Sequence, residues 1–217
     1  MKTTTLPLTE VIGEKRVTLH HLTWQSYQQI LQALPQTRAA RLTYDRGVLE
    51  ITMPLEEHES FRELLGLFVR ILVGETGLKL KSLRSTTLDR QDPQLGAEPD
   101  NAYYIQNQPQ VAGCKVDLQS DPPPDLVIGV DITHSDIDKN NLYAALGVPE
   151  FWRFDGQEWR IFQLRAEVYQ ECDRSPNFPW VRKEYLYNFL AEAQQDEIMA
   201  ERNWRKFVQN YLATTSN

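Results

Sequence analysis

Apolar residues form a nearly continuous run over residues 126–132, interrupted only by Gly129 and Asp131. Such a run is typical of a strand that is covered on both faces of its sheet. Asp125 and Asp131 bracket the run, and Lys139 follows in a segment that predicts a helix. Acids on a buried strand, followed by a lysine on a helix, indicate metal-dependent chemistry. We therefore take residues 122–153 as the segment around which the chain is organised.

The polar residues after this strand predict a turn into that helix. Three of them can cap its first amides, namely Thr133, Ser135 and Asp136. The helix should reach about Leu146, because Gly147 is a typical C-terminal stop. Residues 148–154 then predict the next strand.

Two helices and a hairpin are predicted in the N-terminal half. Thr23 is a typical N-cap for a helix over residues 24–34. Residues 41–53 alternate between apolar and polar positions around a turn at 45–47, which predicts a β-hairpin. Apolar residues then recur at helical spacing over residues 56–73.

The remaining pattern indicates short strands and a helical C-terminus. Strands are expected at 17–19, at 78–83 with an extension over 85–88, at 97–105, at 158–164 and at 166–172. Residues 90–96 are expected to form a loop and residues 186–212 to be mostly helical. The predicted class is α+β, a mixed β-sheet flanked by helices, with an N-terminal helix and hairpin and a C-terminal helical tail. The expected division is an extension over 1–22, one domain over 23–190 and the tail over 191–217.

Large apolar side chains indicate where the core lies. Trp152, Phe154 and Trp159 are expected inside it. Tyr103 and Tyr104 follow each other on a predicted strand, so we expect one in the core and the other beside a cleft. The apolar positions of the helical tail should pack on the domain or on a partner chain.

Composition changes this picture little. The chain has 217 residues, of which 41% are hydrophobic and 24% charged, as expected of one globular domain. No apolar run approaches the roughly 18 residues of a membrane helix, and the first residues lack the apolar core of an export signal. Only two cysteines are present, which favours a reducing, cytoplasmic location over a disulfide framework. The net charge of −7 argues against bulk nucleic-acid binding but leaves room for a local basic patch.

Three groups of acids are candidates for one site: Glu57 and Glu59, Glu98 and Asp100, and Asp125 and Asp131. Mg²⁺ prefers oxygen ligands, usually one or two carboxylates together with water and substrate phosphate. A lysine beside such an ion can hold the attacking water and offset developing negative charge. A single acid at a strand end is more often a cap or a solvated side chain, so only the order of these groups along the chain favours a site.

Four stretches carry a family resemblance: HESFREL at 58–64, AEPDNAYYI at 97–105, PPDLVIGVDITHS at 123–135 and KNNLYAALGVPEFWRFDG at 139–156. Together they resemble the Uma2 family, which is classed with restriction endonucleases of the PD-(D/E)XK nuclease fold. The resemblance spans roughly residues 23–190, and its LYAALGVPEFW part is quite specific. It implies a restriction-endonuclease-like fold and a nuclease that uses Mg²⁺ or Mn²⁺ to hydrolyse DNA.

The resemblance also assigns expected roles to single residues. Asp100 matches the aspartate of the family's Pro-Asp pair, a metal ligand in a catalytic position. Glu59, or its neighbour Glu57, matches the region of the family's helix glutamate. Lys139 resembles the catalytic lysine, which in these proteins has moved from the strand onto the following helix.

Gly129 departs from the family pattern, because relatives usually carry the second acid there. Side chains alternate along a strand, so Asp131 shares the face of Gly129 but lies about 6.6 Å further along. We expect Asp131 to act as the second metal ligand from this displaced position, with impaired cleavage as the consequence. Glycine inside a strand also marks a bulge or a close backbone approach.

Four residues are expected to contact the substrate: Lys79, Lys81, Arg84 and His58. The first three lie on or beside one predicted strand and could form a ridge for phosphates. Alternate lysines on a strand are more often simply its solvated face. His58, in the first turn of a helix, is similarly more often a solvated or capping residue.

Three functions remain open on these grounds. The first is a metal-dependent DNA endonuclease, the second a catalytically inactive DNA-binding or regulatory protein, and the third a hydrolase of small phosphoesters. A homodimer would suit the first, since cutting both strands of a duplex requires two sites. The nuclease hypothesis predicts Asp100, Asp131 and Lys139 in one cleft, with the lysine amine within about 12 Å of a carboxylate.

Overall fold

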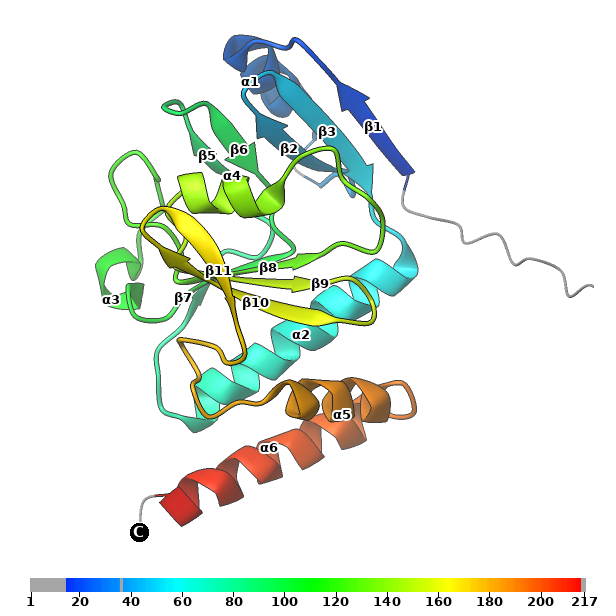
Figure 1. The fold of residues 1–217 in the computed structure, drawn as a ribbon, viewed down its shortest axis with the longest axis vertical. Coiled ribbons are helices and arrows are strands. Elements are labelled where there is room, and N and C mark those ends of the chain that lie inside the picture. Colours follow the sequence, from blue (N-terminus) through cyan, green and yellow to red (C-terminus); the bar gives the residue numbers. More distant parts are fainter. Residues whose placement is uncertain (1–14, 36, 216–217) are drawn as a thin grey trace, which may run out of the picture.

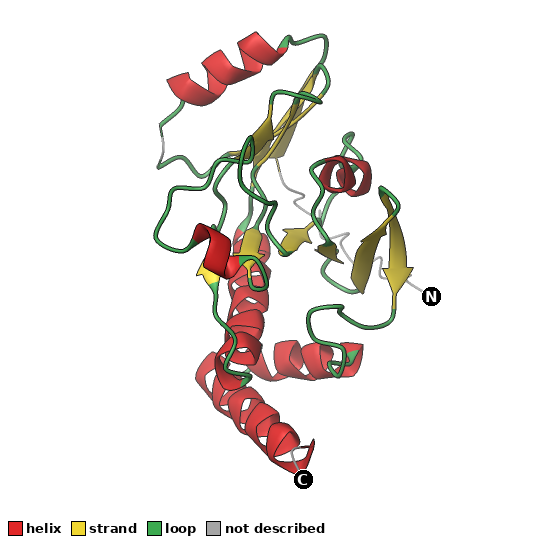
Figure 2. Ribbon diagram, turned by 90° about the vertical axis from the view of Figure 1, so that its left-hand side faces the viewer, coloured by secondary structure: helices red, strands yellow, loops and turns green. Residues whose placement is uncertain are grey.

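Two β-sheets, with helices packed against them, make up the fold (Figure 1). The computed structural model describes residues 15–35 and 37–215. The predicted α+β class is confirmed, whereas the expectation of one sheet is wrong. The first sheet and the C-terminal helix lie at opposite ends of the molecule, as Figure 2 shows from the side.

The first sheet is antiparallel throughout, with strand order β1-β3-β2-β6-β5. Its strands are β1 (Lys15–Leu19), β2 (Arg41–Asp45), β3 (Val48–Met53), β5 (Leu88–Arg90) and β6 (Leu95–Ala97). Helix α1 (Trp24–Ala33) begins at Thr23, whose side chain accepts a hydrogen bond from the amide of Ser26. Tyr27 of α1 stacks on Tyr44 of β2 with ring centroids 4.7 Å apart. The predicted helix and hairpin are therefore confirmed, together with the cap.

The region after α2 differs from its prediction. The strand expected at 78–83 is reduced to β4 (Lys81–Ser82), and the expected loop at 90–96 contains parts of β5 and β6. The chain turns after β4, where Arg84 has a φ of 54° and the amide of Thr86 donates to the carbonyl of Leu83. This turn carries the chain from one sheet to the other, so residues 85–88 do not extend β4.

The second sheet holds the segment 122–153 at its centre. Its strand order is β11-β10-β9-β8-β7-β4, and only the β8–β9 pair is parallel. The strands not yet given are β7 (Asn101–Tyr104), β8 (Leu126–Val130), β9 (Glu150–Phe154), β10 (Trp159–Arg165) and β11 (Val168–Cys172). Every residue of β8 is buried, which confirms the expectation that this strand is covered on both faces.

Helices cover both faces of the second sheet (Figure 1). On one face lies α4 (Lys139–Ala145), and on the other lie α2 (Glu56–Glu75), α5 (Lys183–Ala193) and α6 (Glu197–Thr215). A short helix, α3 (Gln108–Val111), follows β7. The start predicted for α4 is wrong: its cap is Asp138, which accepts from the amides of Asn140 and Asn141. The earlier polar residues lie in a loop that is held by contacts to Arg16, Thr18 and Glu50 of the first sheet.

The C-terminal helices share one core with α2 and the sheet. The indole of Trp204 stacks on Phe68 at 4.4 Å and donates to its carbonyl oxygen. Most of the predicted apolar positions of the tail are buried here, while Ile198 and Phe207 are 58% and 38% exposed. Trp152, Phe154 and Trp159 lie in this core, as predicted. Both Tyr103 and Tyr104 are buried, so the expectation that one lines a cleft is wrong. Tyr103 packs in the core beside α2, and the hydroxyl of Tyr104 donates to the carbonyl of Pro122 in the loop before β8.

Among the described residues, no helix is both long and apolar enough to span a membrane.

Candidate active site

The candidate site lies where β7 begins and β8 ends. These strands are antiparallel, with Asn101 opposite Ile128, so the residue before β7 lies beside the last residues of β8. The amide of Val130 donates to Asp100 Oδ2 at 2.7 Å. Asp131 follows directly, and its own amide donates to the carbonyl of Phe154 at 2.8 Å. Strand pairing thus brings two buried carboxylates, far apart in the sequence, to the same end of the sheet.

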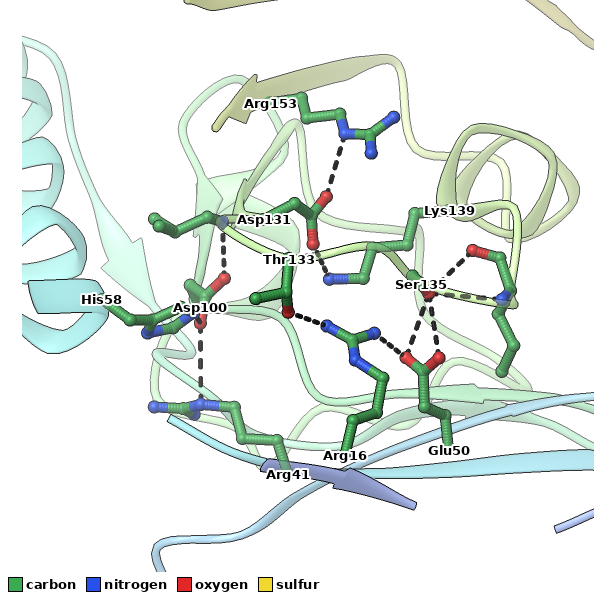
Figure 3. Close-up of polar contacts among 12 residues, drawn as sticks. Arg16, Arg41, Glu50, His58, Asp100, Asp131, Thr133, Ser135, Lys139 and Arg153 are labelled. Atoms are coloured by element: carbon green, nitrogen blue, oxygen red, sulfur yellow. Dashed lines mark hydrogen bonds and ion pairs between the residues drawn. The ribbon is translucent and has the colours of Figure 1, made fainter. Parts of the chain in front are cut away.

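Two cations hold the carboxylate of Asp131 (Figure 3). The ammonium of Lys139, the first residue of α4, forms an ion pair with Oδ1. Arg153 of β9 places Nε 3.0 Å from Oδ2. The closeness expected of Asp131 and Lys139 is therefore present, while the roles expected of them stay predictions.

Asp100 has a different set of partners. His58 Nε2 lies 3.2 Å and Arg41 Nε 3.6 Å from its Oδ1. Burial by itself would raise the pKa of Asp100. The hydrogen bond and charge of His58, the charge of Lys139 and the backbone amide outweigh burial, so the pKa of this carboxyl lies below its ordinary value. Asp100 is therefore ionised at neutral pH.

Lys139 keeps its charge for a related reason. Burial disfavours the ammonium and would lower the pKa of Lys139. The charges of Asp131 and Asp100, with the hydrogen bond to Asp131, outweigh that effect and raise the pKa above its ordinary value. In this arrangement the lysine is a hydrogen-bond donor and a fixed positive charge.

His58 was expected to be solvated or to cap its helix, and this expectation is wrong. Its side chain is only 4% exposed, because the first turn of α2 presses against the end of the second sheet beside Asp100. The sequence also proposed it as a substrate contact. The structure makes it a neighbour of the Asp100 carboxylate.

Of the two candidate helix acids, Glu59 is joined to Asp100 through Arg41 and Glu57 is not. Arg41 Nη2 donates to Glu59 Oε1 at 3.0 Å, and Arg62 Nη2 lies 2.7 Å from Oε2. Arg41 thereby links Glu59 to Asp100, while Glu57 is exposed on the helix surface. Sequence analysis missed Arg41, because nothing in the strand pattern of β2 distinguishes it from a solvated residue.

A second carboxylate network fixes the loop between β8 and α4. Glu50 of β3 is 1% exposed and forms an ion pair with Arg16 of β1. It accepts hydrogen bonds from the Ser135 hydroxyl at 3.0 Å and from the Asp136 amide at 3.1 Å. Arg16 also lies 3.4 Å from the hydroxyl of Thr133. The first sheet thus holds the loop that presents Asp131 and Lys139 (Figure 3).

Two acids that were expected to converge do not reach the site. Asp125 lies at the other end of β8, where its carboxylate accepts from the amides of Ile105 and Asn107 at 2.7 and 2.9 Å. Glu98 pairs with Arg38 and accepts from the amide of Leu42 at 2.9 Å. Both carboxylates therefore bind backbone amides of loops and strand ends rather than joining Asp100 and Asp131.

The predicted basic ridge is not assembled at the carboxylates. Lys81 pairs with Tyr104 at the far end of β7 and donates to the carbonyls of Val111 and Cys114. Its ammonium is used to hold the loop after α3, so a substrate contact is not its role in this structure. Lys79 and Arg84 are exposed, and Arg84 follows β4 on the side nearer Asp100.

Phe151 fills the space beside Gly129. A β-carbon at position 129 would lie 3.2 Å from the Phe151 ring and 3.9 Å from Asp131 Oδ2. The carboxylate of Asp131 therefore extends back toward the position of the missing side chain, much closer than the strand spacing alone predicts. A ring and a displaced aspartate occupy the place where the family resemblance predicts an acid.

Comparisons with known proteins identify the family and the fold. The sequence model of the Uma2 family, described as "Putative restriction endonuclease", matches residues 24–187. The chain belongs to the Uma2 family. A solved structure titled as a putative nuclease belonging to DUF820, from Anabaena variabilis, is similar with a TM-score of 0.53 and 15% identity, and the match covers 77% of this chain and 98% of that one. The comparison with curated proteins gives no match.

The predicted restriction-endonuclease-like fold of this Uma2 protein is confirmed by that structural likeness. At so low an identity the likeness concerns the fold alone. The arrangement of the site therefore has to be judged on its own residues.

The donor set of this Uma2 protein fits a hard divalent cation. Asp100 and Asp131 supply ionised oxygens at one strand end, and Mg²⁺ or Mn²⁺ commonly takes one or two carboxylates with water and phosphate. Among the residues that the structure describes, no group of three or more acids, histidines or cysteines could hold a metal. Both oxygens of Asp131 already contact cations. A metal at this site would therefore compete with Lys139 and Arg153.

Proposed function

We propose that this Uma2 protein is an endonuclease that hydrolyses phosphodiester bonds of DNA with Mg²⁺ or Mn²⁺ as cofactor. The observation that carries the proposal is the meeting of three side chains at one sheet end: the ionised Asp100, Asp131, and Lys139 on Asp131. Family resemblance would assign Asp100 and Lys139 to catalysis, and Asp131 would stand in for the second acid that Gly129 lacks. Double-strand cutting would require two such sites, so we propose a homodimer for that reaction.

Each residue has a role that its chemistry permits. Asp100 and Asp131 would hold the cation, which when bound would supply Lewis-acid activation of water and charge neutralisation at the phosphate. Hydrolysis adds water across one P–O bond, and a proton of that water ends on the leaving oxygen. Lys139, being protonated, cannot act as the base. It would instead donate a hydrogen bond to the attacking oxygen or to the phosphate and offset the negative charge that develops there.

Glu59 and His58 would act on the metal site indirectly, through Asp100. Glu59 holds Arg41 beside Asp100, and His58 contacts Asp100 directly. Both would keep the Asp100 carboxylate in one orientation, and His58 also lowers the pKa of Asp100 by its hydrogen bond and charge. Their substitution should therefore weaken metal binding more than it weakens DNA binding.

Cleavage should be slow, because the cation would have only two carboxylates from this chain. Divalent-ion affinity depends on the number and placement of charged oxygens. A second function, an inactive DNA-binding or regulatory protein, is favoured by one specific observation. Both oxygens of Asp131 lie within ion-pair distance of a cation, so the charge of this carboxylate is balanced without a metal.

Plasmid nicking separates the two functions. The unaltered protein, Asp100→Ala and Lys139→Met are compared with Mn²⁺ and with a chelator, and Glu57→Ala serves as a control that removes an exposed acid from the same region. We expect slow, Mn²⁺-dependent nicking that both site variants abolish and the control retains. No nicking by the unaltered protein, with DNA binding intact, would favour the inactive alternative.

A further inference from the structure

Arg153 stands beside the substituted position of the site. It pairs with Gly129 in the parallel register of β8 and β9, so both residues belong to the same face of the sheet. It is the only residue of β9 that is not buried, and its side chain is 39% exposed. Neighbouring Phe151 fills the space at Gly129, while Arg153 reaches past it to Asp131.

The contact that Arg153 makes is specific. Its Nε lies 3.0 Å from Asp131 Oδ2, the oxygen that extends toward the position of the missing glutamate. Lys139 takes the other oxygen, Oδ1. Arg153 therefore covers the oxygen that would best replace the family's second acid as a metal ligand.

The two terminal amino groups of Arg153 are not used in its contact with Asp131. Among the described residues, no hydrogen bond or ion pair to either Nη atom is present, and Figure 3 shows this end of the guanidinium directed away from Asp131. A guanidinium with unused donors is suited to bind two oxygens of one phosphate.

A shallow polar pocket of about 520 Å³ opens at this place, lined by Arg153 and Lys139 together with residues 134–138 and Asn140. Two acids in its wall have partners already: Asp136 accepts from the hydroxyl of Thr18 at 2.8 Å, and Asp138 caps α4. The pocket is thus a place where a phosphate group can reach two cations of the candidate site.

We propose that Arg153 is a phosphate-binding residue that occupies Asp131 until metal and a phosphodiester arrive together. The inference rests on the proposed function, because it places the cation on Asp131 Oδ2. A cation binding alone must displace Arg153 and break its ion pair with Asp131, while the charge of Asp155 remains near the guanidinium. A phosphodiester gives the released guanidinium a new anion, so metal and phosphate each strengthen binding of the other by the same factor.

Calorimetric titration of Mn²⁺ tests this without measuring cleavage. It is carried out on the folded full chain, with and without dimethyl phosphate, the smallest phosphodiester probe, at equal ionic strength. The variants are Arg153→Gln and Arg153→Lys, and the matched control is Arg160→Gln. Arg160 lies opposite Arg153 on β10 but pairs with Glu158, so it removes the same charge one strand further from Asp131.

Arg153→Gln should bind Mn²⁺ alone about fivefold more tightly than the unaltered protein, because a competing cation is gone. Dimethyl phosphate should strengthen Mn²⁺ binding by the unaltered protein and by Arg160→Gln, but not by Arg153→Gln. Arg153→Lys should keep the competition and lose most of the coupling, since an ammonium lacks the fork that holds two oxygens.

Equal Mn²⁺ affinity in the unaltered protein and Arg153→Gln would overturn the inference. Coupling to dimethyl phosphate that survives in Arg153→Gln would overturn it as well. Either result could occur while Asp100→Ala still weakens Mn²⁺ binding, in which case the metal site of the proposed function stands. Absence of Mn²⁺ binding in every protein, Arg153→Gln included, would instead remove the metal site and the inference with it.

Discussion

The aromatic ring of Phe151 lies 3.2 Å from the place where a β-carbon at Gly129 would stand. Restoring the family's acid here therefore means moving the ring. We predict that Gly129→Glu alone lowers the free energy of unfolding by about 1–3 kcal/mol, the usual effect of overpacking. The double variant Gly129→Glu with Phe151→Leu should recover part of that loss in stability. It should also bind Mn²⁺ more tightly and nick plasmid faster than the unaltered protein.

Denaturant unfolding is measured for the unaltered protein, the two single variants and the double variant. Calorimetry then compares Mn²⁺ binding by the unaltered protein and the double variant. Phe151→Leu alone is the control, because it removes ring volume without adding an acid. Additive effects of the two substitutions would contradict the packing explanation. Unchanged Mn²⁺ affinity in the double variant would show that position 129 has no access to the cation.

Asp100 should make stability depend on pH in the acid range. Its pKa in the folded protein lies below the ordinary value of 3.8. The ionised carboxylate therefore stabilises the fold above the pKa of the unfolded chain, and this contribution is lost as pH falls through the lower, folded value. Asp100→Asn should lower the free energy of unfolding by about 3 kcal/mol at pH 7, because Arg41 and His58 lose their shared anion.

The difference between the unaltered protein and Asp100→Asn should shrink as pH falls below about 4, where the unfolded chain begins to take up the proton. Urea unfolding at pH 7, 5 and 3 measures it. Glu57→Gln, in which the acid lost is exposed, should follow the unaltered protein at each pH. A constant difference for Asp100→Asn across this range would contradict the argument.

Glu50 should affect the site although it contacts none of the proposed catalytic side chains. Glu50→Gln removes the charge that holds Arg16, Ser135 and the Asp136 amide, so the loop before α4 should loosen. We expect weaker Mn²⁺ binding and a loss of about 1–3 kcal/mol in stability. Calorimetry and urea unfolding measure the two effects.

The matched control is Glu171→Gln on β11, a strand glutamate that is 47% exposed and 3.8 Å from Lys183. Neither quantity should change there. If Glu50→Gln lowered stability but left Mn²⁺ affinity intact, the Glu50 network would be a structural link without influence on the site.

The C-terminal helix should be needed for stability. Trp204→Ala should cost about 3–5 kcal/mol, because the indole is 5% exposed and stacks on Phe68. Phe207→Ala, three residues further on the same helix but 38% exposed, should cost much less. Deleting all residues after Asp196 should lower the melting temperature more than either substitution. An unchanged melting curve for the deletion would show that α6 does not contribute to the core.

Local patterns predicted the elements that local interactions decide. The Thr23 cap, the hairpin turn at 45–47 and the buried strand β8 all depend on neighbouring residues, and each is present. The pairing of Lys139 with Asp131 was also accessible, since the two lie eight residues apart across one turn. Sheet membership of β5 and β6 was not accessible, because it depends on which distant strand they join.

The site was predictable only for the residues that carry the family motif. Arg41, Glu50 and Arg16 come from strands of the first sheet, where a charged residue between apolar ones reads as solvated. Glu50 is buried, and Arg16 and Arg41 are partly buried, because the two sheets contact each other. The alternation of apolar and polar residues along a strand does not indicate such a contact. The same contact explains why α4 begins later in the chain than predicted, since Glu50 binds Ser135 and the amide of Asp136, which were expected to cap the helix.

The position of Arg16 bears on how the protein can be shortened. A chain that began at Thr23, where the helical pattern and the family resemblance start, would lack β1 and with it the cation paired to Glu50. The Glu50 carboxylate would keep its hydrogen bonds from Ser135 and the Asp136 amide but would be a buried charge without its ion-pair partner, a defect of about 3–5 kcal/mol. The smallest working unit of this protein therefore includes β1, a strand that carries no residue of the family motif.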